Sequence, residues 1–178
     1  SAWAGRPLGV DCVIGVGWVA RGLCAAVAAG GCNGIQFGGE SGCQDILDSV
    51  KGISKEQVRT AVDAAVKVGI DPVCSFMVPF PEDTRETLQE TGEFMQALYQ
   101  AGSKILLSYT SPYPGTYFYD HARELGLKML TDKWDEFDAK HVIMETRHLS
   151  AAEIEAAVGT IARQIGMHWS TESEYSRN

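Results

Sequence analysis

The chain has 178 residues, of which 45% are hydrophobic, 21% charged and 9% aromatic. This composition supplies enough apolar side chain for one core and excludes disorder as a description of the whole chain. Lys and Arg total 15 against 23 Asp and Glu, so the formal net charge of -8 excludes nucleic-acid binding through a broad basic face.

No apolar run approaches the roughly 18 to 20 residues that cross a bilayer, and no signal peptide opens the chain. We therefore expect a cytoplasmic protein without a membrane span. The five cysteines show no CxxC spacing, and their odd number favours reduced, buried thiols over a disulfide framework. They are Cys12, Cys24, Cys32, Cys43 and Cys74.

The first predicted elements alternate between strand and helix. Residues 11–16 are β-branched and apolar, residues 19–30 are rich in small helix formers, and residues 34–37 form a second short strand. This second strand runs into the glycine-rich turn at residues 38–42. Such a turn lets the backbone approach a ligand closely.

The central elements continue the alternation. Residues 43–50 predict one or two helical turns, and a longer helix begins at a capping box of Ser54 and Gln57 and ends at Gly69. Residues 71–78 are nearly all apolar, which is typical of a strand buried on both faces. The apolar face of the helix comprises Val58, Ala61, Val62, Ala65 and Val66.

The next helix begins at Asp83 or Thr84 and ends at Gly102, and residues 104–109 form the fourth strand. The predicted buried stripe of this helix is Leu88, Thr91, Met95, Leu98 and Tyr99.

Beyond the loop at residues 110–116, we expect a short helix over 117–125, which Gly126 ends. Residues 134–145 are ambiguous, with 141–144 as an extended candidate. The last helix begins at a capping box of Ser150 and Glu153.

Strict alternation of strands and helices predicts an α/β fold with right-handed crossovers and a parallel sheet. An open doubly wound sheet and part of a β/α barrel both satisfy this order. In either architecture the ligand site lies at the C-terminal ends of the strands. The loops at 38–42, 79–83 and 110–116 fall at those ends.

Three segments in order carry a family resemblance: FGGESG at 37–42, FMVPFPEDTRETL at 76–88 and YTSPYPGTYFYDHARELGL at 109–127. Together they resemble the C-terminal half of a radical S-adenosylmethionine (SAM) enzyme core, and the final helix beginning HLSAAE is also similar. The resemblance is to the cobalamin-associated group that includes the anaerobic magnesium-protoporphyrin IX monomethyl ester oxidative cyclase.

The resemblance implies a 5'-deoxyadenosyl radical, formed from SAM by reduction at a [4Fe-4S] cluster inside a partial barrel. Carried over by position, Glu40 and Ser41 face the ribose and aminocarboxylate of SAM. Gly38 and Gly39 keep side chains away from the ligand. Alternatively, Glu40 and Ser41 only cap the following helix.

The other two loops are assigned in the same way. The backbone from Val78 and Pro79 to Pro81 lies near the adenine. Tyr109, Pro112 and Tyr113 line the mouth for a small-molecule substrate, which is porphyrin-like or otherwise hydrophobic. Packing of these aromatic rings against the barrel is the alternative reading.

The chain also departs from the family pattern. Residues 79–84 read PFPEDT where the family has glycine on each side of the first proline, and the cluster-binding CxxxCxxC is absent. We therefore expect a C-terminal fragment that is inactive alone and whose partner is the missing N-terminal part of the same chain. The cofactors of the parent enzyme would be SAM, the cluster and, in this group, cobalamin.

The expected organisation is a half barrel over residues 1–149, followed by a helix and polar tail over 150–178. Exposed edges of such a sheet predict self-association. No metal ligands or catalytic residues are assigned, because the four histidines lack metal-binding spacing and the acidic pair of Glu82 and Asp83 fits the first turn of a helix. The alternative functions are a non-catalytic α/β ligand- or partner-binding module and, more weakly, a hydrolase or aldolase fragment with Glu40 as base.

Overall fold

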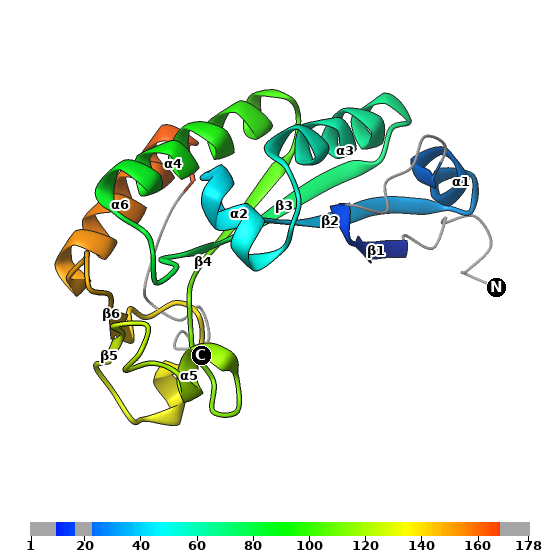
Figure 1. Cartoon of the computed structure of the whole chain (residues 1–178). Coiled ribbons are helices and arrows are strands. Elements are labelled where there is room, and N and C mark those ends of the chain that lie inside the picture. Colours follow the sequence, from blue (N-terminus) through cyan, green and yellow to red (C-terminus); the bar gives the residue numbers. More distant parts are fainter. Residues whose placement is uncertain (1–9, 17–22, 168–178) are drawn as a thin grey trace, which may run out of the picture.

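The computed structural model describes residues 10–16 and 23–167 of the chain. Its centre is a four-stranded parallel sheet with the strand order β1-β2-β3-β4 (Figure 1). The strands are β1 (Val10–Ile14), β2 (Cys32–Glu40), β3 (Asp71–Val78) and β4 (Lys104–Tyr109). The parallel α/β prediction is confirmed.

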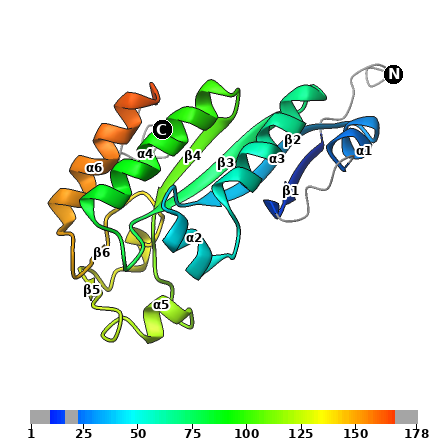
Figure 2. The same cartoon turned by 45° about the horizontal axis from the view of Figure 1, so that its top comes forward.

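The long helices cover one face of this sheet (Figures 1 and 2). They are α1 (Leu23–Ala29), α3 (Lys55–Lys67) and α4 (Arg85–Gln100), with α6 (Ala151–Gln164) packed against α4. Within the described ranges, no helix covers the other face, where Val13 is 80% and Leu106 50% exposed. In a barrel this open face would point inward.

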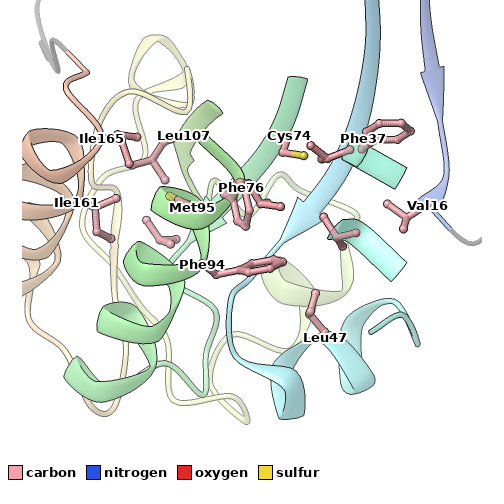
Figure 3. Packing of buried hydrophobic residues seen from close by; sticks show 14 of the residues in the cluster. Val16, Phe37, Leu47, Cys74, Phe76, Phe94, Met95, Leu107, Ile161 and Ile165 are labelled. Carbon is pink, nitrogen blue, oxygen red and sulfur yellow. The ribbon is translucent and has the colours of Figure 1, made fainter. Parts of the chain in front are cut away.

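The core lies between the sheet and its helices (Figure 3). Phe37 and Phe76 point from β2 and β3 toward the helices and are fully buried, and the Phe76 ring meets Phe94 of α4 edge to face at 6.1 Å. Two predictions for the helical faces are wrong, because Val66 is 43% and Tyr99 53% exposed. Each lies at the margin of its apolar stripe, where a helical side chain is only partly covered.

The strands at 71–78 and 104–109 have the predicted bounds, and the capping boxes at Ser54 and Ser150 are present. The Ser54 hydroxyl accepts from the Gln57 amide, and the Gln57 side chain accepts from the Ser54 amide. These local signals therefore set the helix starts as expected.

The chain beyond β4 is less regular than predicted. It contains only short elements: α5 (Tyr117–Asp120), β5 (Lys128–Met129), the 3-10 turn η2 (Trp134–Glu136) and β6 (Met144–Glu145). β5 and β6 pair antiparallel, and the whole segment lies beyond the C-terminal end of β4 (Figure 1). Its position places it next to the ends of the strands that carry the predicted site.

Two predictions are only partly covered. The start of the helix expected at 19–30 lies outside the described residues, as does part of the 150–178 segment. No described helix is long and apolar enough to cross a membrane.

The division of the chain into two parts at residue 150 and the self-association through exposed sheet edges stay predictions.

The cysteines behave as small hydrophobes. Cys24, Cys32, Cys43 and Cys74 are buried, and Cys12 is half-buried. Burial raises the pKa of the Cys74 thiol to about 11, which keeps it protonated and unreactive.

Candidate functional site

A pocket of about 340 Å³ opens where β2 and β3 end. Its lining comes from four separate parts of the chain: the end of β2, the end of α2 (Gln44–Val50), the end of β3 with its loop, and α5. The lining residues are Glu40, Val50, Lys51, Met77, Phe80 and Phe118. The charged wall consists of Glu40 and Lys51, and the apolar wall consists of Met77, Phe80 and Phe118.

The charged wall begins with an irregularity in β2. The register between β2 and β3 shifts between Gly38 and Glu40, so Gly39 is an extra residue in the strand. Glu40 has a φ of 52°, an unusual conformation for a residue with a side chain, and the Ser41 amide donates to the Gly39 carbonyl at 2.7 Å. Such a bulge redirects a side chain, here the Glu40 carboxylate, toward the pocket.

Lys51 completes this wall. Its Nζ lies 2.6 Å from Glu40 Oε1 and also donates to the Gly38 carbonyl at 3.1 Å. A Cβ at Gly38 would lie only 2.1 Å from Lys51 Nζ and 2.3 Å from Glu40 Oε1. A side chain at position 38 would therefore displace the ends of the Lys51 and Glu40 side chains.

Ser41 faces the other way. It is 1% exposed, its hydroxyl lies 3.3 Å from Thr91 Oγ1, and it accepts from the Cys43 amide at 3.1 Å. The Gly42 amide donates to Thr91 Oγ1 at 2.9 Å. Ser41 thus ties the turn to α4 and to Cys43, the N-cap of α2, without capping the helix itself, while Glu40 alone of the pair reaches the pocket.

Asp83 anchors the loop that carries the apolar wall. The side chain is 1% exposed, and its two oxygens accept from the Phe80 amide at 2.7 Å and from Thr87 Oγ1 at 2.6 Å. Burial raises the pKa of Asp83 to about 6, against the lowering effect of these two hydrogen bonds. The prediction that Glu82 and Asp83 belong to the first turn of the helix is wrong, because both precede Thr84, the N-cap of α4. Glu82 is exposed, whereas Asp83 is buried in the loop.

The raised pKa of Asp83 predicts a pH dependence of stability. The carboxyl group binds its proton more tightly in the folded than in the unfolded chain, so its contribution to stability is fully present below about pH 4 and is lost as pH rises through about 6. The free energy of unfolding of the Asp83→Asn variant, relative to that of wild type, should therefore rise by up to about 3 kcal/mol between pH 4 and pH 7. Urea unfolding at both pH values measures this, with Glu82→Gln as the matched control. A constant difference between wild type and Asp83→Asn across this range would contradict the assignment.

The remaining predicted residues lie around the pocket. Val78 and Pro79 are buried at the end of β3 and are joined by a cis peptide bond. Tyr109 is 2% exposed, Pro112 is buried, and Tyr113 is 45% exposed with its hydroxyl donating to the Phe137 carbonyl at 2.7 Å. None of these five side chains lines the 340 Å³ pocket, so their assigned ligand contacts stay predictions.

Two hydroxyl groups that follow the end of β4 have no hydrogen-bond partner among the described residues. Thr110 Oγ1 and Ser111 Oγ are both buried, while the Thr110 amide donates to the Val78 carbonyl at 2.9 Å. A buried hydroxyl without a partner costs about 1–3 kcal/mol. A water or ligand atom bound beside these hydroxyls would remove that cost.

Sequence reasoning missed Lys51 and the apolar wall of Met77, Phe80 and Phe118. Lys51 lies 11 residues after Glu40, on the far side of α2, and only the fold brings the two together. Met77 could have been found, because it alternates with buried Phe76 and Val78 along β3 and so points to the open face.

The described residues include no group of three or more His, Cys, Asp or Glu that could hold a metal ion. For the whole chain, the absence of a metal ligand set stays a prediction. A [4Fe-4S] cluster has no fitting ligands in the part of the chain that the structure describes.

Residues 12–95 match the radical SAM superfamily. An uncharacterized methyltransferase from Pyrococcus horikoshii is 32% identical over 130 residues, which make up 72% of this chain and 28% of that protein. The chain thus spans little more than a quarter of the length of this curated relative.

Solved structures show the same fold. The radical SAM methyltransferase TsrM from Kitasatospora setae, with cobalamin and a [4Fe-4S] cluster bound, superposes with a TM-score of 0.60 at 16% identity, covering 93% of this chain and 36% of TsrM. Coproporphyrinogen III oxidase (HemN) from Escherichia coli gives a TM-score of 0.50 at 12% identity, over 85% of this chain and 37% of HemN. At these identities the likeness concerns the fold, which is the βα arrangement of a radical SAM partial barrel.

Proposed function

We propose, from the match of residues 12–95 to the radical SAM superfamily, that the 340 Å³ pocket is part of the SAM site of a larger radical SAM enzyme. The observation that carries the proposal is the Glu40 and Lys51 ion pair, which faces an apolar wall at the C-terminal ends of parallel strands. Ligands of α/β sheets bind at this edge.

The chemistry of the lining fits SAM. A carboxylate accepts from ribose hydroxyls or from an ammonium group, and a lysine ammonium group donates to a carboxylate, so Glu40 and Lys51 can hold the polar half of SAM. Met77, Phe80 and Phe118 offer the apolar surface that a flat adenine packs against. The volume lies within the range of about 300–1,000 Å³ that is usual for small-molecule sites.

Each residue of the site then has a role in binding. Glu40 orients the ribose, Lys51 holds both Glu40 and the ligand carboxylate, and the loop at Phe80 sets the position of the adenine. Ser41 and Asp83 are positioning residues, because they fix the two loops through buried hydrogen bonds without reaching the pocket.

The cluster is assigned to another part of the enzyme, because the described residues do not fit it. The open face of the sheet and the coverage of 28% of the methyltransferase relative both support a missing portion that completes the barrel. We assign no residues of this chain to cobalamin.

The reaction we propose for the complete enzyme is methyl transfer to a small molecule. The relative at 32% identity is named a methyltransferase, whereas the likeness to the oxidase concerns the fold alone. Nothing in the pocket is specific to a tetrapyrrole, so the porphyrin assignment rests only on the sequence resemblance.

The test expresses the reading frame upstream of Ser1 together with this chain, reconstitutes iron and sulfide anaerobically, and supplies dithionite as the one-electron reductant. We expect SAM consumption to 5'-deoxyadenosine or S-adenosylhomocysteine, abolished by Glu40→Ala and retained by Glu56→Ala on the exposed surface of α3. A complete reading frame without cluster cysteines would favour the alternative of a non-catalytic binding module, whereas full activity in Glu40→Ala would show that this pocket is not part of the SAM site.

A further inference from the structure

A second pocket of about 240 Å³ lies in the irregular segment beyond β4, on elements that the SAM proposal does not use. It is formed by the loop before α5, by α5 itself, and by the chain from β5 to η2. Its lining consists of Pro114, Tyr119, Met129, Thr131, Asp132, Trp134 and Phe137.

Of the three aromatic residues that line this second pocket, Trp134 and Tyr119 are exposed, whereas Phe137 is buried. The Trp134 and Phe137 rings lie 5.5 Å apart at 37°, and Phe137 is fixed in turn by Tyr113, whose hydroxyl donates to its carbonyl at 2.7 Å. Trp134 is nevertheless 68% exposed and Tyr119 40% exposed. Large aromatic faces presented to solvent beside a pocket are typical of a binding surface.

The single charged lining residue is acidic. No hydrogen bond or ion pair joins the Asp132 carboxylate to any residue that the structure describes. The adjacent Lys133 is paired with Glu136 at 3.3 Å, so it does not neutralise Asp132. The net charge of -8 adds a field that attracts cations.

We propose that this second pocket binds an organic ammonium group, with Trp134, Tyr119 and Phe137 as the aromatic faces and Asp132 as the counter-charge. Aromatic faces attract cations through their quadrupole, and the attraction is strongest for Trp. At 240 Å³ the pocket is smaller than the roughly 300 Å³ lower limit of drug-sized sites, so it accommodates an ammonium group with a few carbons and excludes a tetrapyrrole ring.

The position of α5 connects this pocket to the other one. Phe118 lines the candidate SAM pocket, and its neighbour Tyr119 lines the ammonium pocket, so the two lie on either side of one short helix. A substrate anchored here by its ammonium group would extend past α5 toward the SAM pocket. This link, and with it the assignment of the substrate as an amine, rests on the proposed function, whereas the binding of an ammonium group does not.

The test is a titration of the 178-residue chain with choline, followed by the backbone amide and Trp indole signals in two-dimensional NMR spectra. The neutral probe of the same shape is 3,3-dimethylbutan-1-ol. We expect saturable shifts at residues 129–137 with choline and a dissociation constant at least about fivefold weaker for the neutral probe.

Two variants separate the contributions of charge and ring. Asp132→Asn and Trp134→Leu should each weaken choline binding by about fivefold or more, while Asp135→Asn, which changes an exposed acid outside the lining, should change it less than twofold. Circular dichroism checks that each variant is folded.

Equal affinity for the two probes, equal effects of the Asp132 and Asp135 variants, or absence of saturable shifts at these residues would each overturn the proposal. Choline contains no adenosine and needs no cluster. Failure of this titration is therefore distinguishable from failure of the SAM site.

Discussion

Alanine in place of Gly42 is expected to lower the free energy of unfolding by about 3 kcal/mol, the largest stability effect that we predict for a single methyl group. The added Cβ would lie 2.4 Å from the Thr91 Cα, 2.8 Å from the Glu90 carbonyl oxygen and 2.9 Å from the Phe94 Cβ. The first two are backbone atoms of α4, which cannot rotate aside. The turn at 38–42 must then move away from α4.

Gly159→Ala on α6 is the matched control. Its Cβ would meet only Arg163 Nη1, at 3.5 Å. The free energy of unfolding of this variant should therefore rise by up to about 1 kcal/mol, because alanine has a higher helix propensity than glycine. Urea unfolding of both variants measures the contrast. A Gly42→Ala variant as stable as wild type would show that the turn does not pack on α4 as described.

The Gly42→Ala substitution should also disturb the candidate site. The Gly42 amide donates to Thr91 Oγ1, and the Ser41 hydroxyl lies 3.3 Å from the same atom. Glu40 directly precedes these two residues. Displacing the turn would therefore redirect the Glu40 carboxylate, and any SAM binding should weaken together with stability.

Glu40→Gln is expected to weaken SAM binding to the chain by about tenfold or more, because hydrogen bonds to a charged group contribute about 1.5–3 kcal/mol. The substitution keeps the size of the side chain and removes its charge. Stability should change by less than about 1 kcal/mol, since the ion pair with Lys51 is partly exposed, with side-chain exposures of 29% for Lys51 and 21% for Glu40.

The control for this prediction is Glu56→Gln, which changes an exposed carboxylate in the first turn of α3. It should leave SAM binding unaltered. If Glu40→Gln and Glu56→Gln bound SAM equally well, Glu40 would have no part in the ligand site.

Much of the fold follows from local signals in the sequence. The run at 71–78 and the capping boxes at Ser54 and Ser150 predicted their elements correctly, because burial on both faces and hydrogen bonding at helix starts are encoded within a few residues. The segment beyond β4 was less predictable. Its two-residue strands β5 and β6 exist only because distant segments pair.

The site was predictable in part. The glycine-rich turn indicated Glu40. Its ion pair with Lys51 depends on the path of the chain through α2, which brings Lys51 back to the end of β2. The burial of Asp83 depends on the packing of its loop against α4, where Thr87 bonds the carboxylate. An acidic residue beside prolines has the sequence character of a surface loop. Its burial is a property of the tertiary structure.

The most direct test of the central claim is a titration of the 15N-labelled chain with SAM, with the amide shifts mapped onto the structure. The account predicts shifts concentrated at residues 38–41, 50–52, 77–80 and 118, and their loss in Glu40→Gln at the same SAM concentration. Shifts confined to other residues, or an unchanged spectrum at millimolar SAM, would contradict the assignment of this pocket to SAM.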